Sequence, residues 1–469
     1  MTHVKEQPSD NLAKDSNPVS DFLYATNPMT WEPTPDYQTH SKRSNLDRIT
    51  QVYHALQVAG NADSQQLDES YERTMEFFEN SFDAYSQSLV GEVDQVGRVF
   101  VVPMRITRGE EAYASEVLPF APLLDPEFGV NADIRQKTVV GLPPSVLDTY
   151  MSSSSPERQG ALVLAPLYGD MQQDMVTRQK GVRRQMQRVK LARLVNRHIN
   201  ETAKFSSDVL GAKVMGLGAI IPAITNFGTS IKNRDIITTT GHGGTVDLIV
   251  QTTKKSLEAL DSSKGTIGVI GGAGSIGYAS LDVVRSRMPN QEIVAYDRNM
   301  KKLRELVDGR QDNSSIMAVD NATSVLERAD VVITAVTTPI DLDEIDPGCE
   351  LDLNNKIIID DSQPGSFNRQ QVEARNGRLV WVVGNDSSED GFLERTRGYT
   401  YGTEAGLYGP RAVWGCEAEA AVIAASGEYD KAICERVTPK HARDIGKLCV
   451  RYGVTSAEFQ SYGQPVSLL

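Results

Sequence analysis

Short apolar runs alternate with predicted helices along the second half of the chain. Each run is rich in Val and Ile, and a helix is predicted between it and the next run. Such alternation is typical of a parallel sheet whose strands are joined by helices. The runs that we expect to be strands are 266–270, 292–296, 316–319, 331–336, 356–359 and 379–383. The pattern predicts an α/β fold with a doubly wound parallel sheet.

Further elements are predicted on either side of that sheet. Tyr71, Met75, Phe78 and Phe82 recur at helical spacing within 67–89, which favours one buried helix face. We also expect helices over 46–58, 416–426 and 439–451, strands over 96–106, 213–215 and 235–237, and an apolar run at 161–167. This order indicates a second α/β unit before the main sheet and a helical segment after it.

The glycine spacing after run 266–270 is that of a dinucleotide-binding turn. Gly272, Gly274 and Gly277 form a GxGxxG pattern between that run and a predicted helix. We expect Gly272 to allow the tight turn, Gly274 to let N–H groups approach the phosphates, and Gly277 to bring the helix close to the strand. The strand–turn–helix–strand context favours a dinucleotide site over a turn without phosphate, and hence a Rossmann domain.

Other candidate cofactor residues follow the predicted strands. Asp297 ends the second strand, where an acid normally binds the ribose 2′-OH and favours NAD. The ends of strands in a doubly wound sheet face the nicotinamide and the substrate. The full predicted cofactor set is Gly272, Gly274, Ser275, Ile276, Gly277, Asp297, Arg298, Thr337, Thr338 and Pro339.

Composition narrows the class of protein. A chain of 469 residues with a net charge of −14 is long enough for several domains, and its charge argues against nucleic acid as the main partner. No apolar run is long enough for a membrane span, and the N-terminus lacks the apolar core of a signal peptide. The four cysteines show no metal or disulfide spacing. We therefore expect a cytoplasmic protein with free thiols and no metal site.

The predicted domain boundaries follow from these features. We expect a disordered, polar N-terminus at 1–45, an N-terminal extension of helices and a strand at 46–140, an α/β substrate domain at 141–260, a Rossmann domain at 261–395, and a helical C-terminal segment at 396–469. Within the substrate domain, 178–197 carries eight Lys or Arg residues and no acid. Such a stretch is usually a solvated helix face, but in an acidic protein it also suits docking.

Two residues are candidates for chemistry. Cys416 begins a helix of small residues, and a helix N-terminus favours the thiolate, whereas the adjacent Glu417 and Glu419 oppose it. From position alone, a small buried hydrophobic residue is the simpler interpretation. His242 lies between glycines after a predicted strand, where it could act as a general acid or hydrogen-bond donor, or be only a solvated turn residue.

The order of motifs resembles that of the long-chain acyl-[acyl-carrier-protein] reductases of cyanobacterial type, over about 142 to 455. The shared motifs are Pro143-Pro-x-Val146, Leu210 to Ala219, Thr239-Thr240-Gly241 with Thr245, the glycine-rich loop, Asp360 to Pro364, x-Cys416-x-Ala-Glu419, Ile445-Gly446 and Arg451-Tyr-Gly453. In that family the cysteine of the motif that matches x-Cys416-x-Ala-Glu419 takes the acyl group as a thioester. The resemblance therefore implies that Cys416 is a nucleophile.

The same resemblance implies the reaction and its partners. An acyl thioester of acyl carrier protein or CoA would be reduced to an aldehyde through Cys416, with Glu419 organising the site and His242 or Thr240 helping to hold the oxyanion. Arg298 aligns with the arginine that the family offers to the 2′-phosphate, which implies NADPH rather than NADH. The basic stretch 178–197 would dock the acidic carrier protein.

This chain also departs from the family. His242 stands where Asn is usual, and Ile433-Cys434-Glu435 replaces a Gly-Arg-Asn segment. These departures concern the identity of the acyl group more than the chemistry. The alternatives are a glutamyl-tRNA-reductase-like or shikimate-dehydrogenase-like enzyme, although the negative charge disfavours a tRNA substrate, and a nucleotide-sensing protein without turnover.

Overall fold

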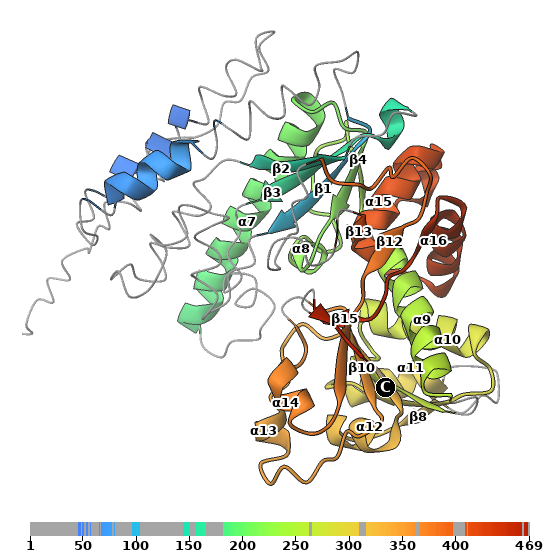
Figure 1. Cartoon of the computed structure of the whole chain (residues 1–469). Helices are drawn as coiled ribbons and strands as arrows, with labels where there is room; N and C mark the ends of the chain where they lie inside the picture. Colours follow the sequence, from blue (N-terminus) through green and yellow to red (C-terminus); the bar gives the residue numbers. More distant parts are fainter. Residues whose placement is uncertain are drawn as a thin grey trace, which may run out of the picture.

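The computed structural model describes most of the chain from residue 144 onward and shorter stretches before it (Figure 1). The described residues are 46, 47, 49, 50, 53, 54, 57, 65, 67–76, 79, 96–103, 144–150, 155–165, 182–261, 265–308, 316–362, 365–396, 409, 411–461 and 464–467. Where described, 46–58 and 67–79 are helical, and Tyr71 and Met75 pack against a core cluster as their spacing predicts. The predictions for 1–45 and 107–140 lie outside these residues.

The glycine-rich half of the chain forms a parallel sheet of Rossmann order. Within the described residues, six strands pair in the order β11-β10-β9-β6-β7-β8, and every pair is parallel. They are β6 (Thr266–Ile270), β7 (Glu292–Tyr296), β8 (Ile316–Ala318), β9 (Val331–Thr334), β10 (Ile357–Asp360) and β11 (Arg378–Trp381). The chain runs outward from β6 to β8 and returns to β9 on the other side of β6. This confirms the predicted fold and creates a switch point between β6 and β9, where such sheets bind dinucleotides.

Helices cover this sheet on both faces (Figure 1). They include α10 (Ser275–Arg287), α11 (Met300–Asp308), α12 (Ala322–Arg328), α13 (Leu342–Ile345) and α14 (Arg369–Glu373). Successive strand residues point to opposite faces, so Ile357 and Ile359 belong to one core cluster and Ile358 to another. Burial on both faces explains why these strands read as unbroken apolar runs.

A second sheet precedes the Rossmann sheet, as the pattern predicts, but it includes the strand predicted at 96–106, which we expected in the N-terminal extension rather than in the substrate domain. Its order among the described residues is β2-β3-β1-β4-β5, parallel throughout except for the antiparallel pair β2–β3. Its strands are β1 (Arg98–Pro103), β2 (Ser145–Tyr150), β3 (Gly160–Ala165), β4 (Val214–Leu217) and β5 (Ile237–Thr239), joined by η3 (Pro156–Arg158), α7 (Val182–Asp208) and α8 (Ile221–Ile224). Because β4 and β5 are parallel, the residues that follow them gather at one edge of the sheet.

Long helices connect the two sheets (Figure 1). α9 (His242–Ala259), α15 (Gly415–Ser426) and α16 (Pro439–Arg451) share one core cluster with a face of the Rossmann sheet. α15 also rests on the second sheet, since a Cβ on Gly216 in β4 would come within 2.7 Å of the Ala420 Cβ. The remaining elements are β12 (Gly384–Asp386), β13 (Ala412–Val413), η4 (Tyr429–Lys431), β14 (Val454–Ser456), β15 (Gln460–Ser461) and β16 (Gln464–Pro465). α15 therefore begins where the two sheets meet.

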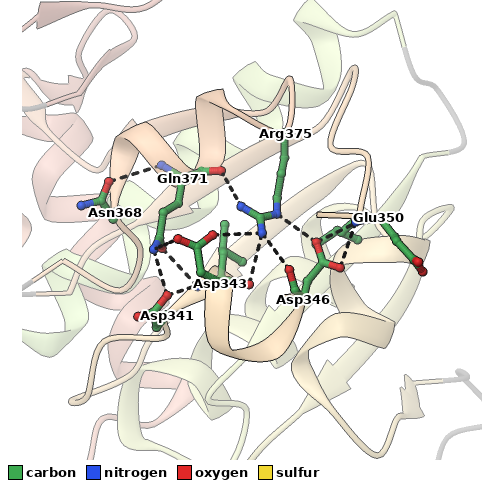
Figure 2. Close-up of polar contacts among 9 residues, drawn as sticks. Asp341, Asp343, Asp346, Glu350, Asn368, Gln371 and Arg375 are labelled. Atoms are coloured by element: carbon green, nitrogen blue, oxygen red, sulfur yellow. Dashed lines mark hydrogen bonds and ion pairs between the residues drawn. The ribbon is translucent and has the colours of Figure 1, made fainter. Parts of the chain in front are cut away.

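A buried arginine joins α13 to the segment after α14 (Figure 2). The side chain of Arg375 is 2% exposed and donates to Asp346 at 3.0 Å and to Asp343 at 3.1 Å. It also donates to the backbone oxygens of Leu342 and Gln371, both at 3.3 Å. The carboxylates and carbonyls around this guanidinium accept hydrogen bonds from its N–H groups. The cluster therefore has a structural role, because it links α13 to the segment after α14 in the Rossmann domain.

Candidate functional site

The glycine-rich loop follows β6 in a tight turn that the backbone of Gly271 makes. Gly271 has a φ of +93°, a conformation that favours glycine, and its N–H and that of Gly272 both donate to the Tyr296 oxygen, at 2.9 and 3.1 Å. We predicted the tight turn at Gly272, and this assignment is wrong: the positive φ belongs to Gly271. Sequence spacing missed it because Gly271 lies just outside the GxGxxG pattern. Gly277 makes the close approach, since a Cβ there would lie 2.2 Å from the Gly271 oxygen.

The start of α10 suits an anion. Its N-cap is Gly274, which has no side chain to accept hydrogen bonds from the first turn. The N–H groups of Ser275 and Ile276 therefore belong to a helix start that the chain itself leaves without a side-chain cap. Helix starts of this kind hold the pyrophosphate of a dinucleotide, because the N–H groups and the helix dipole both favour negative charge. The loop thus fits the predicted cofactor.

The end of β7 surrounds the loop with charged side chains. Asp297 accepts hydrogen bonds from the backbone N–H groups of Ala273 at 2.9 Å and Asn299 at 2.7 Å. Arg298 is exposed. Lys302 donates to the Ala273 oxygen at 2.8 Å, so it lies against the loop as well. We did not predict Lys302 as a loop contact, because its position one turn into α11 carries no motif.

The strand ends on the other side of the switch point form the opposite wall. Thr337, Thr338 and Pro339 follow β9 and are exposed. Asp360, at the end of β10, is buried and fixes the next turn, since it accepts from the N–H groups of Ser362 at 2.9 Å and Ser366 at 2.6 Å. The exposed threonines are therefore free to meet a ligand at this edge, whereas Asp360 is occupied in holding the loop.

Cys416 lies in the first turn of α15, against residues that follow β4 and β5. A Cβ on Gly241 would come within 2.3 Å of the Cys416 Cβ, so only glycine fits there. Gly241 itself has a φ of +75°. Ala219, whose φ of +49° is uncommon for alanine, directs a backbone hydrogen bond to the sulfur. Backbone in sparsely populated conformations clusters at functional sites, and here it lies on both sides of one thiol.

The surroundings of Cys416 disfavour the thiolate. Burial raises the pKa of the thiol, and the charges of Asp361 and Glu417 raise it further, whereas backbone hydrogen bonds from Ala219 and Glu417 act in the opposite direction. The effect of the helix N-terminus on the pKa of Cys416 is therefore outweighed by burial and by the neighbouring acids. The sequence alone left this balance open. Asp361 was not among our predicted site residues. Its position could have indicated it, because Asp361 follows β10 at the same edge of the sheet as the other strand ends.

Glu419 is a buried organiser of this region. Its carboxylate accepts hydrogen bonds from the Thr239 hydroxyl and from the Gly244 N–H at 2.9 Å, and it lies 3.5 Å from Nε2 of His441. Burial acts to raise the pKa of Glu419, but the neighbouring His441 and the hydrogen bonds from Thr239 and Gly244 outweigh it and lower the pKa. An ionised Glu419 thus joins α15 to the end of β5 and the start of α9, beside Cys416.

His242 connects the cysteine side of the site to the glycine-rich loop. It is the first residue of α9, next to Gly241, and its Nδ1 lies 3.3 Å from the Ser275 hydroxyl at the start of α10. Burial lowers the pKa of His242 to about 4, so the ring is neutral near pH 7. Thr240 is fully buried, and its hydroxyl lies 3.4 Å from the His242 backbone N–H, so it supports His242.

The remaining predictions for this region concern other cysteines, metals and the basic stretch. Cys349 is exposed, Cys434 is half-buried and Cys449 is buried. Within the described residues, no group of His, Cys, Asp and Glu is arranged to hold a metal ion. The described part of 178–197 belongs to α7, where Arg193 and Arg197 are exposed. None of the helices in the described part of the chain is long and apolar enough to cross a membrane.

Comparison with known families identifies the loop region. Residues 266–364, from β6 through β10, match the family described as NADP oxidoreductase, coenzyme F420-dependent. The match covers about a fifth of the chain and is to an NADP-binding domain, in agreement with the predicted NADPH. Comparison with curated proteins found no match.

Solved structures share parts of this arrangement. The imine reductase of Bacillus cereus is 19% identical over 27% of this chain and 44% of its own, with a TM-score of 0.20, so this chain spans less than half of that protein. L-tryptophan dehydrogenase from Nostoc punctiforme is 12% identical over 76% of this chain and 80% of its own, with a TM-score of 0.31. Shikimate dehydrogenase from Aquifex aeolicus is 10% identical over 75% of this chain and 97% of its own, with a TM-score of 0.28.

Proposed function

We propose that this NAD(P)-dependent oxidoreductase reduces an acyl thioester to an aldehyde, with Cys416 as the nucleophile. The observation that carries the proposal is the position of Cys416 beside Gly241, one residue from the histidine that contacts the glycine-rich loop. A thiol at this place would hold an acyl group close to the dinucleotide site. Such fixation matters because an acyl group on a mobile carrier arm is poorly oriented for reduction.

The first half of the reaction needs only residues of this chain. The Cys416 sulfur attacks the thioester carbonyl carbon, a new carbon–sulfur bond forms, and the carrier leaves as its thiol with the proton that Cys416 gives up. Asp361 and Glu417 are the two carboxyl groups whose charges act on this thiol, and the effect of Asp361 is the larger. Burial raises the pKa of Asp361 well above its ordinary value, and neighbouring Asp360 adds to the rise. A carboxylate of raised pKa is a better proton acceptor, so we assign Asp361 the transfer of the proton: it takes the proton from Cys416 and passes it to the sulfur of the leaving carrier.

Neutral His242 suits the developing oxyanion. The Ser275 hydroxyl oxygen lies 3.1 Å from the Val437 N–H, which donates to it, and the same hydroxyl can then donate to Nδ1 of His242. In that tautomer Nε2 carries the remaining proton and donates a hydrogen bond without carrying a full charge. We assign His242 the stabilisation of the carbonyl oxygen, with Thr240 positioning it and Glu419 positioning the start of α9.

The cofactor site completes the reaction. Gly274, Ser275 and Ile276 would hold the pyrophosphate, Arg298 the 2′-phosphate, and residues 337–339 would line the edge nearest the nicotinamide. Bound NADPH would supply the hydride that converts the Cys416-bound acyl group into an aldehyde and frees the thiol. Acyl carrier protein is the preferred carrier of the substrate, because the exposed Arg193 and Arg197 on α7 offer a basic surface to an acidic partner.

Substitution of Cys416 tests this function. We expect Cys416→Ser to abolish aldehyde formation from acyl thioester while the Kd for NADPH stays within a few-fold of wild type. Cys349→Ser is the matched control, because Cys349 is an exposed thiol in another part of the chain, and it should leave turnover unchanged. Turnover by the Cys416→Ser variant at a rate near that of wild type would exclude the proposed chemistry.

A further inference from the structure

The segment between η4 and α16 lies against the start of α10. The Val437 N–H donates to the Ser275 hydroxyl at 3.1 Å, and the Ile433 oxygen accepts from the Thr240 N–H at 3.0 Å. The backbone is therefore fixed at both ends of a short stretch, with Arg436 adjacent to its contact with the glycine-rich loop. The sequence drew attention to this stretch only through Ile433-Cys434-Glu435, a departure from the resembled family, and gave Arg436 no role.

An aromatic ring in a strained conformation orients Arg436. The guanidinium carbon lies 5.9 Å from the centre of the Phe227 ring, and the same ring meets the edge of His242 at 5.9 Å between centroids. Phe227 has a φ of +57°, which is uncommon for a bulky side chain. Strain of this kind persists where the surroundings require it. The ring thus links Arg436 to the histidine that touches Ser275.

The charge of Arg436 also acts on a second cation, Lys302, on which Asp297 acts in the opposite direction. Burial lowers the pKa of Lys302, and the charge of Arg436 lowers it further, so the two cations lie close enough to repel. Among the described residues, Arg436 makes no ion pair or hydrogen bond with a side chain. The nearby Asp297 already accepts from two backbone N–H groups. An anion bound between Lys302, Arg436 and the uncapped start of α10 would be attracted by all three and would reduce the repulsion between the two cations.

We propose that Arg436 binds the pyrophosphate of the dinucleotide from the segment that lies against the start of α10. Ser275 lies where a pyrophosphate meets a Rossmann helix, and Arg436 is next to the residue that bonds to Ser275. Arg298, at the end of the second strand, lies where a 2′-phosphate would be read instead. The inference rests on the dinucleotide site of the proposed function, and its test measures cofactor binding alone, independently of Cys416.

Titration of the full-length protein with NADPH and with NADH tests this proposal. Nucleotide fluorescence gives the Kd of each without any acyl substrate. Arg436→Gln should raise both values by about tenfold, since a charge-assisted contact to phosphate is lost. Arg298→Gln should raise the NADPH value alone. Arg328→Gln is the charge-matched control, because Arg328 is exposed at the end of α12, before the amino end of β9, and it should change neither value by more than about twofold.

Two outcomes would overturn the assignment. If Arg436→Gln weakens NADPH alone, the arginine reads the 2′-phosphate and the pyrophosphate contact is wrong. If it leaves both values within the range of Arg328→Gln, Arg436 does not bind the cofactor. Circular dichroism of each variant verifies the fold. Phe227→Leu gives a second measure, because loss of the aromatic face should raise the Kd for NADPH and the Kd for NADH by equal factors, as Arg436→Gln does.

Discussion

At the scale of single residues, Cys416 combines good placement with an unfavourable ionisation state. Burial and the charges of Asp361 and Glu417 raise its pKa, so the thiol is protonated in the free protein. Asp361 and Glu417 therefore oppose the proposed role of Cys416 as a nucleophile. In our account the thiol is activated only when its proton can pass to Asp361 as the thioester is attacked, which protects it from other reactions.

Alkylation of Cys416 tests this ionisation state. Because the pKa is raised, the rate constant for iodoacetamide should keep rising about tenfold per pH unit between pH 7 and 9.5, without a plateau. Peptide mass spectrometry identifies the modified cysteine, and glutathione, whose thiol titrates in this range, is the reference. A plateau below pH 8 would mean that Cys416 is a thiolate in the free protein.

Glu419 gives a second prediction at this scale. It is fully buried and ionised, so Glu419→Gln should lower the free energy of unfolding at pH 7 by about 2 kcal/mol. Its pKa in the fold is below the ordinary value of 4.5, so this contribution is complete above pH 4.5 and is lost as the pH falls through the folded pKa. Urea unfolding at pH 7 and at decreasing pH measures it. The exposed Glu305 supplies the control Glu305→Gln; equal small effects of both variants would contradict the role of Glu419.

At the scale of elements, the short helices α13 and α14 depend on Arg375 (Figure 2). Their few residues cannot form stable helices alone, so the buried guanidinium and its acidic partners hold them in place. Arg375→Met should therefore lower the free energy of unfolding by about 3 kcal/mol, because it leaves the half-buried Asp346 carboxylate and the carbonyls of Leu342 and Gln371 without their donor.

Arg369→Met is the matched control for that element. Arg369 pairs with Glu373 at 2.6 Å on the same helix, but its side chain is 32% exposed. An exposed pair of this kind contributes at most about 1 kcal/mol. Chemical unfolding of the two variants under one condition makes the comparison, and a loss in Arg369→Met as large as that in Arg375→Met would show that burial is not the cause.

How well an element is predicted from the sequence depends on whether neighbouring or distant residues form it. β6 and β7 have the bounds expected from their apolar runs, and α15 and α16 begin within a residue of the expected position. These features depend on local pattern and burial. The positive φ at Gly271 and the contact of Arg436 with Phe227 depend on segments that are distant in sequence, and no local pattern encodes them.

At the scale of the whole molecule, the candidate site draws on residues that follow strands of both sheets. Gly241, after β5, lies against Cys416 at the start of α15, and the charge of Asp361, after β10, acts on the same thiol. The sequence predicted each sheet separately. It could not predict that Gly241 would lie against Cys416 or that the charge of Asp361 would act on this thiol, since both depend on how α9, α15 and α16 pack between the sheets.

The surface of the whole molecule gives a prediction about the carrier. With a net charge of −14, the chain should repel an acidic carrier protein except at local basic surfaces such as α7. Arg193→Glu should raise KM for an acyl-carrier-protein substrate, more at low salt than at high salt, and leave KM for acyl-CoA unchanged. Steady-state kinetics at two ionic strengths measure this, and an equal loss on both substrates would mean that the residue is structural.

The most direct test of the account is the mass of the protein after exposure to an acyl thioester without NADPH. Hydride transfer is then blocked, and the acyl group should stay on the nucleophile. We predict a gain of one acyl group on intact wild-type protein, located by peptide mapping at Cys416, released on addition of NADPH, and absent from Cys416→Ser. Failure to acquire the acyl mass, or its location on Cys349, Cys434 or Cys449, would contradict the proposed mechanism.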